Sequence, residues 1–328
     1  MTLRLYDKDL NTVFLEKEFT NPFYAPESGI EERTTYMHKP LGDGFYKEIF
    51  FKGVHIGFGN VSLPKKLLFT FESDYETIEM HFALNGAGRA TAASFPKAIS
   101  FARHQHNIIY ANELCGKMEW EGNDFHICEI NLTPSFFQKF LPGDSQLFDS
   151  FRNRIEKGKS GLLSPQNSFI SHAMYGIIED IMQCQRQGVF KRMFLEAKVL
   201  ELLLLQFEQF MEAPLSQQTT LKHADVDKIY AVRDYLLEHL DADCSLIALA
   251  HQVGTNEFTL KKGFKELFGT SVFAFWADNK MEQAKHLLRE EKMQIAAVAQ
   301  HIGYKNQRHF ASAFKKRFGI APSQFKNS

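Results

Sequence analysis

The fold of the last third of the chain is decided by two stretches that repeat one pattern, SLIALAHQVGTNEFTLKKGFKELFG (residues 245–269) and IAAVAQHIGYKNQRHFASAFKKRFG (residues 295–319). The first five shared positions are 49 residues apart, and the next six are 50 residues apart. An extra residue between the two blocks is tolerated in a turn but not inside a helix. Each copy is therefore predicted to be a helix, a turn and a second helix, and we place the two units at residues 245–268 and 294–318.

The repeated residues have distinct expected roles. A small Ala lets two helices cross closely, a Gly permits a sharp turn with positive φ, an Asn caps the second helix, and a Phe holds its inner face. These residues are Ala250, Gly254, Asn256 and Phe264 in the first unit, and Ala299, Gly303, Asn306 and Phe314 in the second. One such hairpin is a weak signal. Two in tandem predict paired helix-turn-helix units, whose second helices enter the major groove of DNA.

The outer faces of the two second helices carry the residues expected to contact DNA. Arg308 and Lys262 suit a guanine edge, and Gln307 suits adenine. The residues expected to read bases are Phe258, Lys261, Lys262, Gln307, Arg308 and Ser312, and those expected to bind phosphates are Lys265, Lys305, Lys315 and Lys316. Two alternatives remain open at this point: Lys261 also suits a phosphate, and Phe258 either touches a thymine methyl or turns into the core.

The distribution of charge agrees with a DNA-binding end. Residues 221–328 carry 16 Lys and Arg against 12 Asp and Glu, a net charge of +4, whereas the whole chain carries −1. A basic run is often only a solvated face, but Phe310, Phe314 and Phe318 are interleaved with this one at helical spacing, so it belongs to folded structure. Between the units, the periodic stretch Ser271–Glu290 predicts a helix of about 28 Å, close to the roughly 34 Å of one B-DNA turn.

Residues 45–132 have the pattern of β-strands. Ile78–Leu84 alternates between apolar and polar residues, and Asn85–Gly88 has turn chemistry. Further strands are expected at Ile49–Phe58, Leu67–Phe71, Asn107–Tyr110, Met118–Trp120 and Phe125–Leu132. Several short strands with glycine turns predict a sandwich or small barrel.

From about residue 165 the apolar period becomes helical, which predicts helices at 166–183 and 190–210. We expect these two helices to form a dimer interface through Leu203 and Phe207; the alternative is that they are buried against the barrel. Residues 213–222 are polar, contain a Pro and lack periodicity, so they are interpreted as a linker.

Several classes of protein and site are disfavoured. The four cysteines form no CxxC pair, which suits a reducing cytoplasm, and the charged start of the chain does not predict a signal peptide. No apolar run approaches the roughly 20 residues that span a bilayer. His104 and His106 have the HxH spacing of metal-binding barrels, but no third ligand is evident, so hydrogen-bonded histidines are favoured. No catalytic residue, metal or cofactor is predicted, and the chain is not expected to be an enzyme.

Residues 225–326 resemble the DNA-binding domain of AraC/XylS-type transcription regulators. The resemblance includes the Gly-Tyr after the second turn and the Phe-Gly-x-x-Pro at Phe318–Pro322. More narrowly, LKKGFKELFGT (residues 260–270), with Gly263 inside a helix, resembles the siderophore-responsive branch of regulators of pyochelin uptake. The resemblance implies a cupin-like N-terminal sensing barrel, a helical dimer interface, a cytoplasmic homodimer, RNA polymerase as a partner, and a small-molecule effector, for which a ferric siderophore is our expectation.

The fold expected is therefore α+β. A cupin-like barrel or sandwich at 1–164 precedes a helical dimerisation segment at 165–212, the linker at 213–222 and an all-α tandem helix-turn-helix domain at 223–328. Arg89 and Trp120 are the candidate effector contacts. The function expected is a sequence-specific, effector-responsive activator of a siderophore, iron-uptake or neighbouring operon. The alternatives are a ligand-independent dimeric DNA-binding regulator and a metal-binding cupin enzyme with an appended helical domain.

Overall fold

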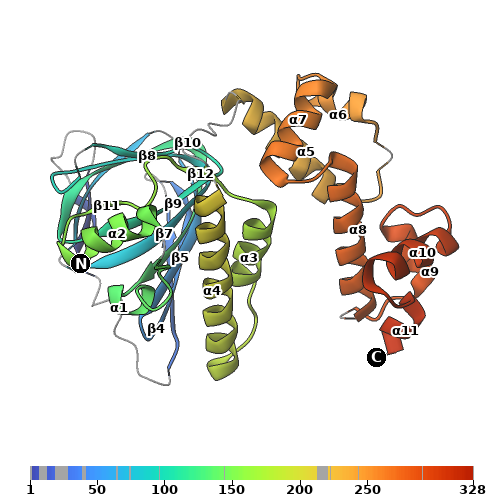
Figure 1. Ribbon diagram of the computed structural model, residues 1–328, viewed down its shortest axis with the longest axis horizontal. Helices are drawn as coiled ribbons and strands as arrows, with labels where there is room; N and C mark the ends of the chain where they lie inside the picture. The colour runs from blue at the N-terminus through green and yellow to red at the C-terminus, as the bar shows by residue number, and fades with distance from the viewer. Residues whose placement is uncertain are drawn as a thin grey trace. The chain divides into compact units, whose positions relative to one another are not determined.

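The computed structural model comprises two compact units, Met1–Leu215 and Ser216–Ser328. Figure 1 shows that a curled sheet with helices forms the first unit, and that the second unit is helical. The residues that the structure describes are 2–6, 13–18, 29–38, 42–63, 66–73, 75–95, 97–143, 145–212, 221, 223–242, 244–289 and 291–327. Apart from residue 221, the stretch interpreted as a linker lies outside the described residues. Within the described ranges, no helix has the length and apolar character needed to cross a membrane.

The strands of the first unit form one antiparallel sheet in the order β11-β9-β7-β10-β5-β4-β3. They are β1 Thr2–Tyr6, β2 Val13–Glu18, β3 Glu31–Met37, β4 Asp43–Phe51, β5 Val54–Ser62, β6 Leu67–Ser73, β7 Thr77–Ala92, β8 Ile99–Phe101, β9 Gln105–Ala111, β10 Leu114–Leu132, β11 Gly161–Leu162 and β12 Ser168–Phe169. The early part of β10 pairs with β6 and its later part with β5, so the sheet curls into a half-barrel.

Helices cover one face of this sheet. The predicted alternation on β7 is confirmed, because Ile78, Met80 and Phe82 are fully buried on that face. The helices of this unit are α1 Pro134–Phe137, α2 Gln146–Glu156, α3 His172–Met182 and α4 Gly188–Glu212. The Phe207 ring of α4 packs 5.6 Å from Phe137 of α1 and 4.9 Å from Phe148 of α2. This apolar layer sets which side chains of the sheet point away from the helices.

Three strand predictions were wrong in their boundaries. Residues 49–58 are not one strand: β4 and β5 form a hairpin around Lys52-Gly53, where Gly53 has φ +79°. The stretch Asn85–Gly88 is not a turn, because β7 continues to Ala92 and only Gly86, with φ +80°, marks an irregularity against β10. The strands predicted at 118–120 and 125–132 are both parts of β10. A glycine with positive φ therefore occurs both at an irregularity within β7 and at the chain reversal between β4 and β5.

The helical segment also differs from expectation. Residues 168–169 pair with β9, so α3 begins only after Ser171, whose side chain accepts a hydrogen bond from the Met174 amide. Leu203 and Phe207 are 1% and 5% exposed within a single chain, so the prediction that they form a dimer interface was wrong. They are buried against the apolar layer of their own unit, which was the alternative.

The second unit contains two hairpins with the same turn. Its helices are α5 His223–Glu238, α6 Leu246–Gln252, α7 Glu257–Phe268, α8 Val272–Arg289, α9 Ile295–His301, α10 Gln307–Phe318 and α11 Pro322–Asn327. Thr255 N donates to Ala250 O at 2.8 Å between α6 and α7, and Tyr304 N donates to Ala299 O at 2.8 Å between α9 and α10. The sequence repeat is thus a repeat of main-chain geometry.

Small residues set the packing of this unit. Phe310 and Phe314 are fully buried in a cluster that joins α8, α9 and α10. In the other hairpin, a Cβ at Gly263 would overlap the Ile229 side chain of α5, so this glycine allows α5 and α7 to approach closely. An intrahelical glycine normally costs about 0.5–1 kcal/mol against Ala, and the close approach of α5 explains its presence.

The two turn glycines predict unequal responses to substitution. Gly254 has φ +68° with open space around it, whereas at Gly303, with φ +78°, a Cβ would lie 2.7 Å from the Asp241 Cα. Gly254→Ala should cost about 1–2 kcal/mol from backbone strain alone. Gly303→Ala should cost more, above about 3 kcal/mol, because overlap with main chain adds to the strain.

Amide hydrogen exchange along α9 and α10, compared with α6 and α7, measures the two effects separately in the full chain. Equal loss of protection in the two variants would contradict this account of the second turn.

Candidate functional site

The outer face of α7 is exposed along its length. Phe258 is 75% exposed, which decides between the two alternatives left open for it: it does not turn into the core. Lys261, Lys262 and Lys265 are exposed on the same face. The Asn256 side chain accepts a hydrogen bond from Thr259 N at 2.9 Å and so fixes where this helix begins.

The outer face of α10 has the corresponding arrangement. Asn306 Oδ1 accepts a hydrogen bond from Arg308 N at 2.7 Å, which places Arg308 in the first turn of the helix. The inner face is buried through Phe310 and Phe314. The remaining predicted contact residues of this hairpin are all exposed, and they are Lys305, Gln307, Ser312, Lys315 and Lys316.

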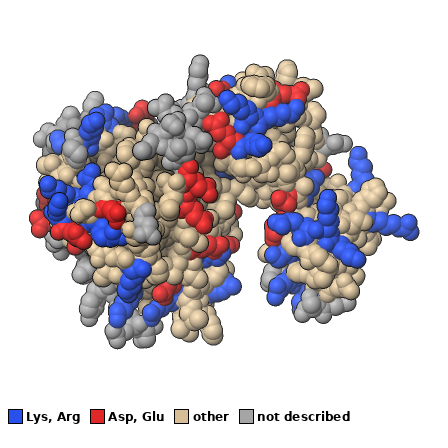
Figure 2. Space-filling view, in the orientation of Figure 1, with Lys and Arg blue, Asp and Glu red and all other residues tan. Residues whose placement is uncertain are grey.

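Few of these basic side chains are neutralised by the protein itself. Lys261 pairs with Glu257 at 3.3 Å. Among the described residues, no acidic side chain forms an ion pair with the predicted contact residues Lys262, Lys265, Arg308, Lys315 and Lys316. Arg317 on the same helix differs, because it lies 3.3 Å from Asp278 and 3.8 Å from Glu282 of α8. Figure 2 shows basic side chains on both halves of this unit. The charge is therefore available to an external anion.

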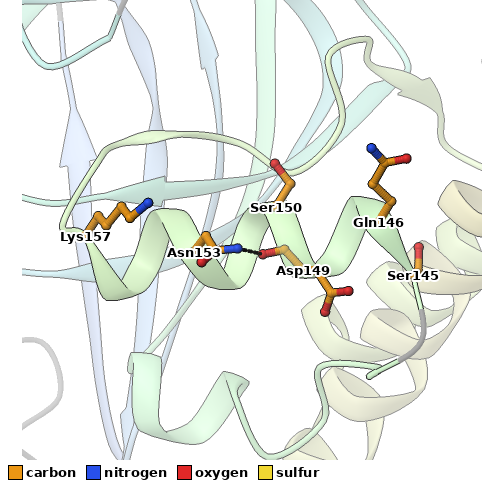
Figure 3. A pocket seen from close by; sticks show the side chains of 6 residues that line it. All are labelled: Ser145, Gln146, Asp149, Ser150, Asn153 and Lys157. Atoms are coloured by element: carbon orange, nitrogen blue, oxygen red, sulfur yellow. Dashed lines mark hydrogen bonds between the residues drawn. The ribbon is translucent and has the colours of Figure 1, made fainter.

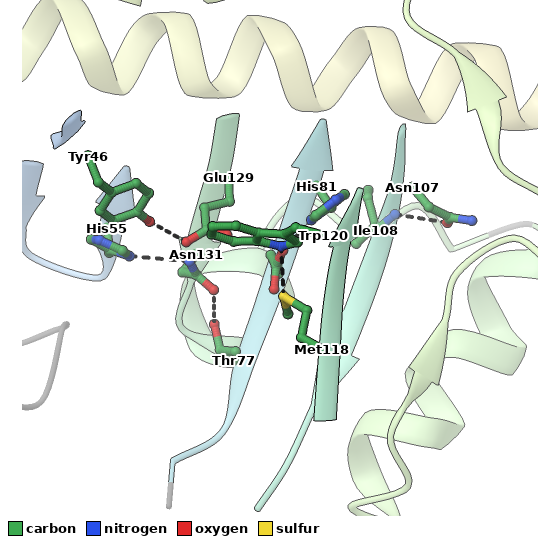
Figure 4. Close-up of polar contacts among 11 residues, drawn as sticks. Tyr46, His55, Thr77, His81, Asn107, Ile108, Met118, Trp120, Glu129 and Asn131 are labelled. Carbon is green, nitrogen blue, oxygen red and sulfur yellow. Dashed lines mark hydrogen bonds and ion pairs between the residues drawn. The ribbon is translucent and has the colours of Figure 1, made fainter. Parts of the chain in front are cut away.

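A second concentration of polar groups lies in the first unit, on the sheet face turned away from the helices, which we call the inner face (Figure 4). Glu129 on β10 lies opposite His81 on β7 and opposite Gly57 on β5. Tyr46 donates a short hydrogen bond to Glu129, and His81 Nδ1 lies 2.7 Å from Glu79 Oε1. Sequence reasoning missed this cluster. The Glu-x-His spacing at 79–81 was a local signal, but only the strand register brings Glu129 to it.

Burial governs the ionisation of this cluster. Burial, together with the charges of Glu79 and Glu48, raises the pKa of Glu129 to about 8, while the Tyr46 hydrogen bond opposes the shift. The pKa of the Tyr46 phenol is likewise raised well above its usual value by burial and by Glu129. The inner face therefore holds acidic groups in an environment that penalises their charge.

The histidines of the HxH motif lie elsewhere and have structural partners. His104 Nδ1 lies 2.5 Å from the Tyr175 hydroxyl. His106 uses both ring nitrogens, Nδ1 at 2.8 Å from Gln206 Nε2 and Nε2 at 2.6 Å from Gln209 Oε1. Because Gln206 donates and Gln209 accepts, this ring is neutral with its proton on Nε2. The structure therefore places both histidines in hydrogen bonds, as the sequence analysis favoured.

The two candidate effector contacts are not brought together. Arg89 is exposed and lies opposite Glu119, whereas Trp120 lies opposite Gly88, so their side chains point to opposite faces of the sheet. The Trp120 ring stacks on Phe125 at 4.4 Å and belongs to an apolar cluster with Tyr46. Trp120 is thus a neighbour of the polar groups of the inner face, and Arg89 is not.

A further pocket lies along α2 (Figure 3). It is lined by polar side chains of that helix and its cap, namely Ser145, Gln146, Asp149, Ser150, Asn153 and Lys157. Asn153 Nδ2 donates to the Asp149 carbonyl at 2.9 Å, so part of this lining is engaged by the helix itself. None of the residues predicted to contact DNA or effector lies here.

Both units match known families. Residues 249–328 match a helix-turn-helix domain, and residues 48–222, more than half of the chain, match the N-terminal domain of the regulatory protein PchR. The chain belongs to the PchR family of AraC-type regulators. The arrangement of two capped, outward-facing helices in the second unit therefore occurs in a helix-turn-helix domain of this family.

Three named relatives align with this chain over different shares of its length. Regulatory protein PchR of Pseudomonas aeruginosa is 35% identical over 125 residues, which are 38% of this chain and 42% of that protein. The MmsAB operon regulatory protein of the same organism is 28% identical, over 70% of this chain and 77% of that protein. The arabinose operon regulatory protein of Escherichia coli is 29% identical, over 40% and 46%. The match thus spans less than half the length of the first and third of these relatives.

The hydrogen-bonded His106 predicts a pH dependence of stability. Burial lowers its pKa from 6.5 to about 4, with the Gln209 hydrogen bond opposing the shift in part. A depressed folded-state pKa contributes stability that is present above about pH 6.5 and is lost as the pH falls towards 4, by up to about 3 kcal/mol. Urea unfolding of the first unit, followed by Trp120 fluorescence, should show this loss.

The variant His106→Gln should lower the stability at pH 7 but flatten its fall between pH 6.5 and 4. His301→Gln, at an exposed histidine of the second unit, serves as the control and should leave the profile unchanged. A wild-type slope in His106→Gln would show that other groups govern acid unfolding.

Proposed function

We propose that this chain is a sequence-specific DNA-binding transcription regulator whose α7 and α10 enter the major groove. The observation that carries the proposal is the repeated geometry, in which two capped helices each bury one face and present the other with exposed Lys, Arg and Gln side chains. An exposed helix of this kind fits the major groove, where side chains reach base edges.

The connecting helix supports contact with two grooves. The 18 residues of α8 correspond to about 27 Å of helix, which is comparable with the roughly 34 Å that separates successive major grooves on one side of B-DNA. Its two ends pack against different hairpins, through Phe264–Phe275 rings 5.3 Å apart and through the cluster that contains Phe310. The two hairpins are therefore held by one rigid element.

The position of a basic residue along its helix separates residues assigned to base contact from residues assigned to phosphate contact. Arg308 is in the first turn of α10, the part that a helix-turn-helix points at base edges, so it is assigned to a guanine. Lys315 is about two turns further and next to the buried Phe314, so it is assigned to the DNA backbone. In α7, Lys262 is assigned to base contact, and Lys265, which corresponds to Lys315 in the repeat, is assigned to phosphate contact.

The first unit is proposed to sense a small molecule and to activate transcription through contact with RNA polymerase. The support is family membership together with the inner face, where the stacked Trp120 and Phe125 adjoin Tyr46 and the acidic groups. Ligand sites typically combine apolar walls with a few converging polar groups. A ferric siderophore is the effector class that the PchR resemblance favours, with control of an iron-uptake or adjacent operon as the outcome.

A homodimer is proposed to form through the outer face of α4 rather than through Leu203 and Phe207. Phe190 is 72% exposed and Met193 is 62% exposed, and they lie one turn apart on this helix. Three other large apolar residues of α4 are exposed, namely Val189, Leu204 and Met211. Exposed apolar groups gathered on one helix mark an association surface, and a second copy of the chain satisfies it with two-fold symmetry.

The assignment of reading and holding residues is tested with two substitutions in α10. Arg308→Ala should cost about 1–3 kcal/mol on the best DNA site and relax preference at one base pair. Lys315→Ala should weaken all sequences about equally and lower the salt dependence of binding by about one phosphate contact.

Selection of binding sites by each variant, followed by affinities at several salt concentrations, distinguishes the two effects. Arg317→Ala is the matched control, because that basic side chain is already paired with α8 acids. If Arg308→Ala keeps the wild-type base preference and changes only the salt slope, the reading face is wrongly assigned.

The dimer surface is tested by Phe190→Glu combined with Met193→Glu. Each apolar side chain buried in an interface contributes about 1.5–3 kcal/mol, so the double variant should dissociate at least about 100-fold more readily. Sedimentation of the folded protein measures this.

Tyr36→Glu changes a side chain that is also exposed, at 68%, but lies on β3, and it should leave the association unchanged. Leu203→Glu should instead unfold the first unit. An unaltered sedimentation profile for the folded double variant would exclude this face of α4 as the interface.

A further inference from the structure

The inner face brings two carboxylates and an imidazole to one point. Glu79 and His81 are alternate residues of β7, and Glu129 lies on β10 directly opposite His81. One ligand atom from each of Glu79, His81 and Glu129 lies within 4.8 Å of the others. Antiparallel pairing places such cross-strand neighbours on the same face of the sheet, so all three side chains share one environment.

The surrounding residues hold these groups in place. A Cβ at Gly57 would overlap the Tyr46 hydroxyl and approach the Glu129 Cγ to 3.2 Å, so the missing side chain makes room for the Tyr46–Glu129 hydrogen bond. On the other side, the His81 ring packs 4.1 Å from Phe101. Positioning of metal ligands by neighbouring hydrogen bonds and rings is typical of built metal sites.

Among the described residues, the two carboxylates at this point have no Lys or Arg partner. Within the described part of the chain, neither Glu79 nor Glu129 is paired with a Lys or Arg, and the ion-pair partner of Glu79 is His81. Glu129 also interacts with the charge of Glu48, which is fully buried. Glu79 and Glu129 are only partly exposed, and converging carboxylates at such a position favour the uptake of protons or of a cation, because uncompensated charge shielded from water is costly.

A buried histidine nearby gives independent evidence. The His55 side chain is 92% buried, since only 8% is exposed, and its Nε2 makes no hydrogen bond within the described residues. This Nε2 lies 3.6 Å from Glu48 Oε1, beyond hydrogen-bond distance. Its Nδ1 is 3.2 Å from Asn131 Nδ2, and Asn131 is in register with Glu79. His55 thus has a buried ring nitrogen that lies beside the Glu48 carboxylate and makes no hydrogen bond within the described residues.

We propose that Glu79, His81 and Glu129 bind a divalent first-row transition-metal ion on the inner face of the sheet. Two carboxylate oxygens and one imidazole nitrogen are suitable ligands for Zn²⁺ or Fe²⁺. Two metal–ligand bonds of about 2.1 Å span at most about 4.2 Å, so a small rotation of one glutamate completes the set. Three protein ligands leave coordination positions open to water or to an external ligand.

This site differs from the HxH motif that the sequence analysis weighed for metal binding. His106 has both ring nitrogens in hydrogen bonds to glutamines, so it has no nitrogen to offer. Cys128, on the same strand as Glu129, faces the opposite side and is fully buried. The ligand set is therefore oxygen and nitrogen only.

The test uses the full-length chain, freed of metal with a chelator and then titrated with Zn²⁺ by calorimetry and with Co²⁺ by visible absorption. The wild type should bind one tight equivalent and show the spectrum of a Co²⁺ ion with oxygen and nitrogen ligands. Glu129→Gln and His81→Ala should each weaken this binding by more than about 100-fold, because loss of even an outer-shell partner costs 10- to 100-fold. Glu121→Gln, at an exposed acid on the same strand, and His301→Ala should bind as the wild type does.

Each outcome of the titrations either supports or overturns the proposed metal site. Failure of the wild type to take up metal, with only protons bound, overturns the proposal, and so does equal binding by all variants. Glu129→Gln keeps the shape of the side chain and resembles the protonated carboxyl that its raised pKa favours, so it should fold; Glu79→Gln provides a second ligand variant if it does not. DNA is absent from these measurements, so their result is independent of the proposed function.

Discussion

The turn at a positive-φ glycine is the constraint on which the second unit depends. At Gly254 and at Gly303 the chain leaves one helix, and within three residues an asparagine caps the next. The turn fixes the angle between the two helices, and the cap fixes the residue at which the exposed helix begins. Together they decide which side chains reach outward. The second turn is also packed against the main chain at Asp241, so it joins two parts of the unit as well as two helices.

In the first unit the governing constraint is the two-residue period of the strands. One set of alternate residues is apolar and accepts helices α1, α2 and α4, and the other set is left facing away from them. A Cβ at Gly57 would overlap the Tyr46 hydroxyl, and a Cβ at Gly59 would overlap the Phe45 main-chain oxygen, so glycine at these positions lets β4 and its side chains approach β5. The register of β5, β7 and β10 brings the acidic groups together there. The same alternation therefore produces both the core and the polar cluster.

Features that depend on residues close together in the sequence could be predicted from it, whereas features that depend on pairing or packing between distant residues could not. The repeat, the Asn caps and the outward face of α10 depend on residues within one turn of each other, so spacing alone predicts them. The β4–β5 hairpin and the continuous β7 were missed because Gly53 and Gly86 both have positive φ, and only pairing with neighbouring strands separates a reversal from a bulge. The Glu79–His81–Glu129 cluster depends on a register across 50 residues, and burial of Phe207 depends on α1 and α2. Neither has a local signature.

The central claim is that one chain presents two reading helices to one side of a DNA duplex. Selection of sites from random duplex DNA by the wild-type full-length chain, at a fixed salt concentration, tests it most directly. The account predicts an enriched site with two conserved segments about one helical turn apart, 10–10.5 bp from centre to centre, for each bound chain. Binding without any enriched sequence, or a site with only one conserved segment for each chain, would contradict it.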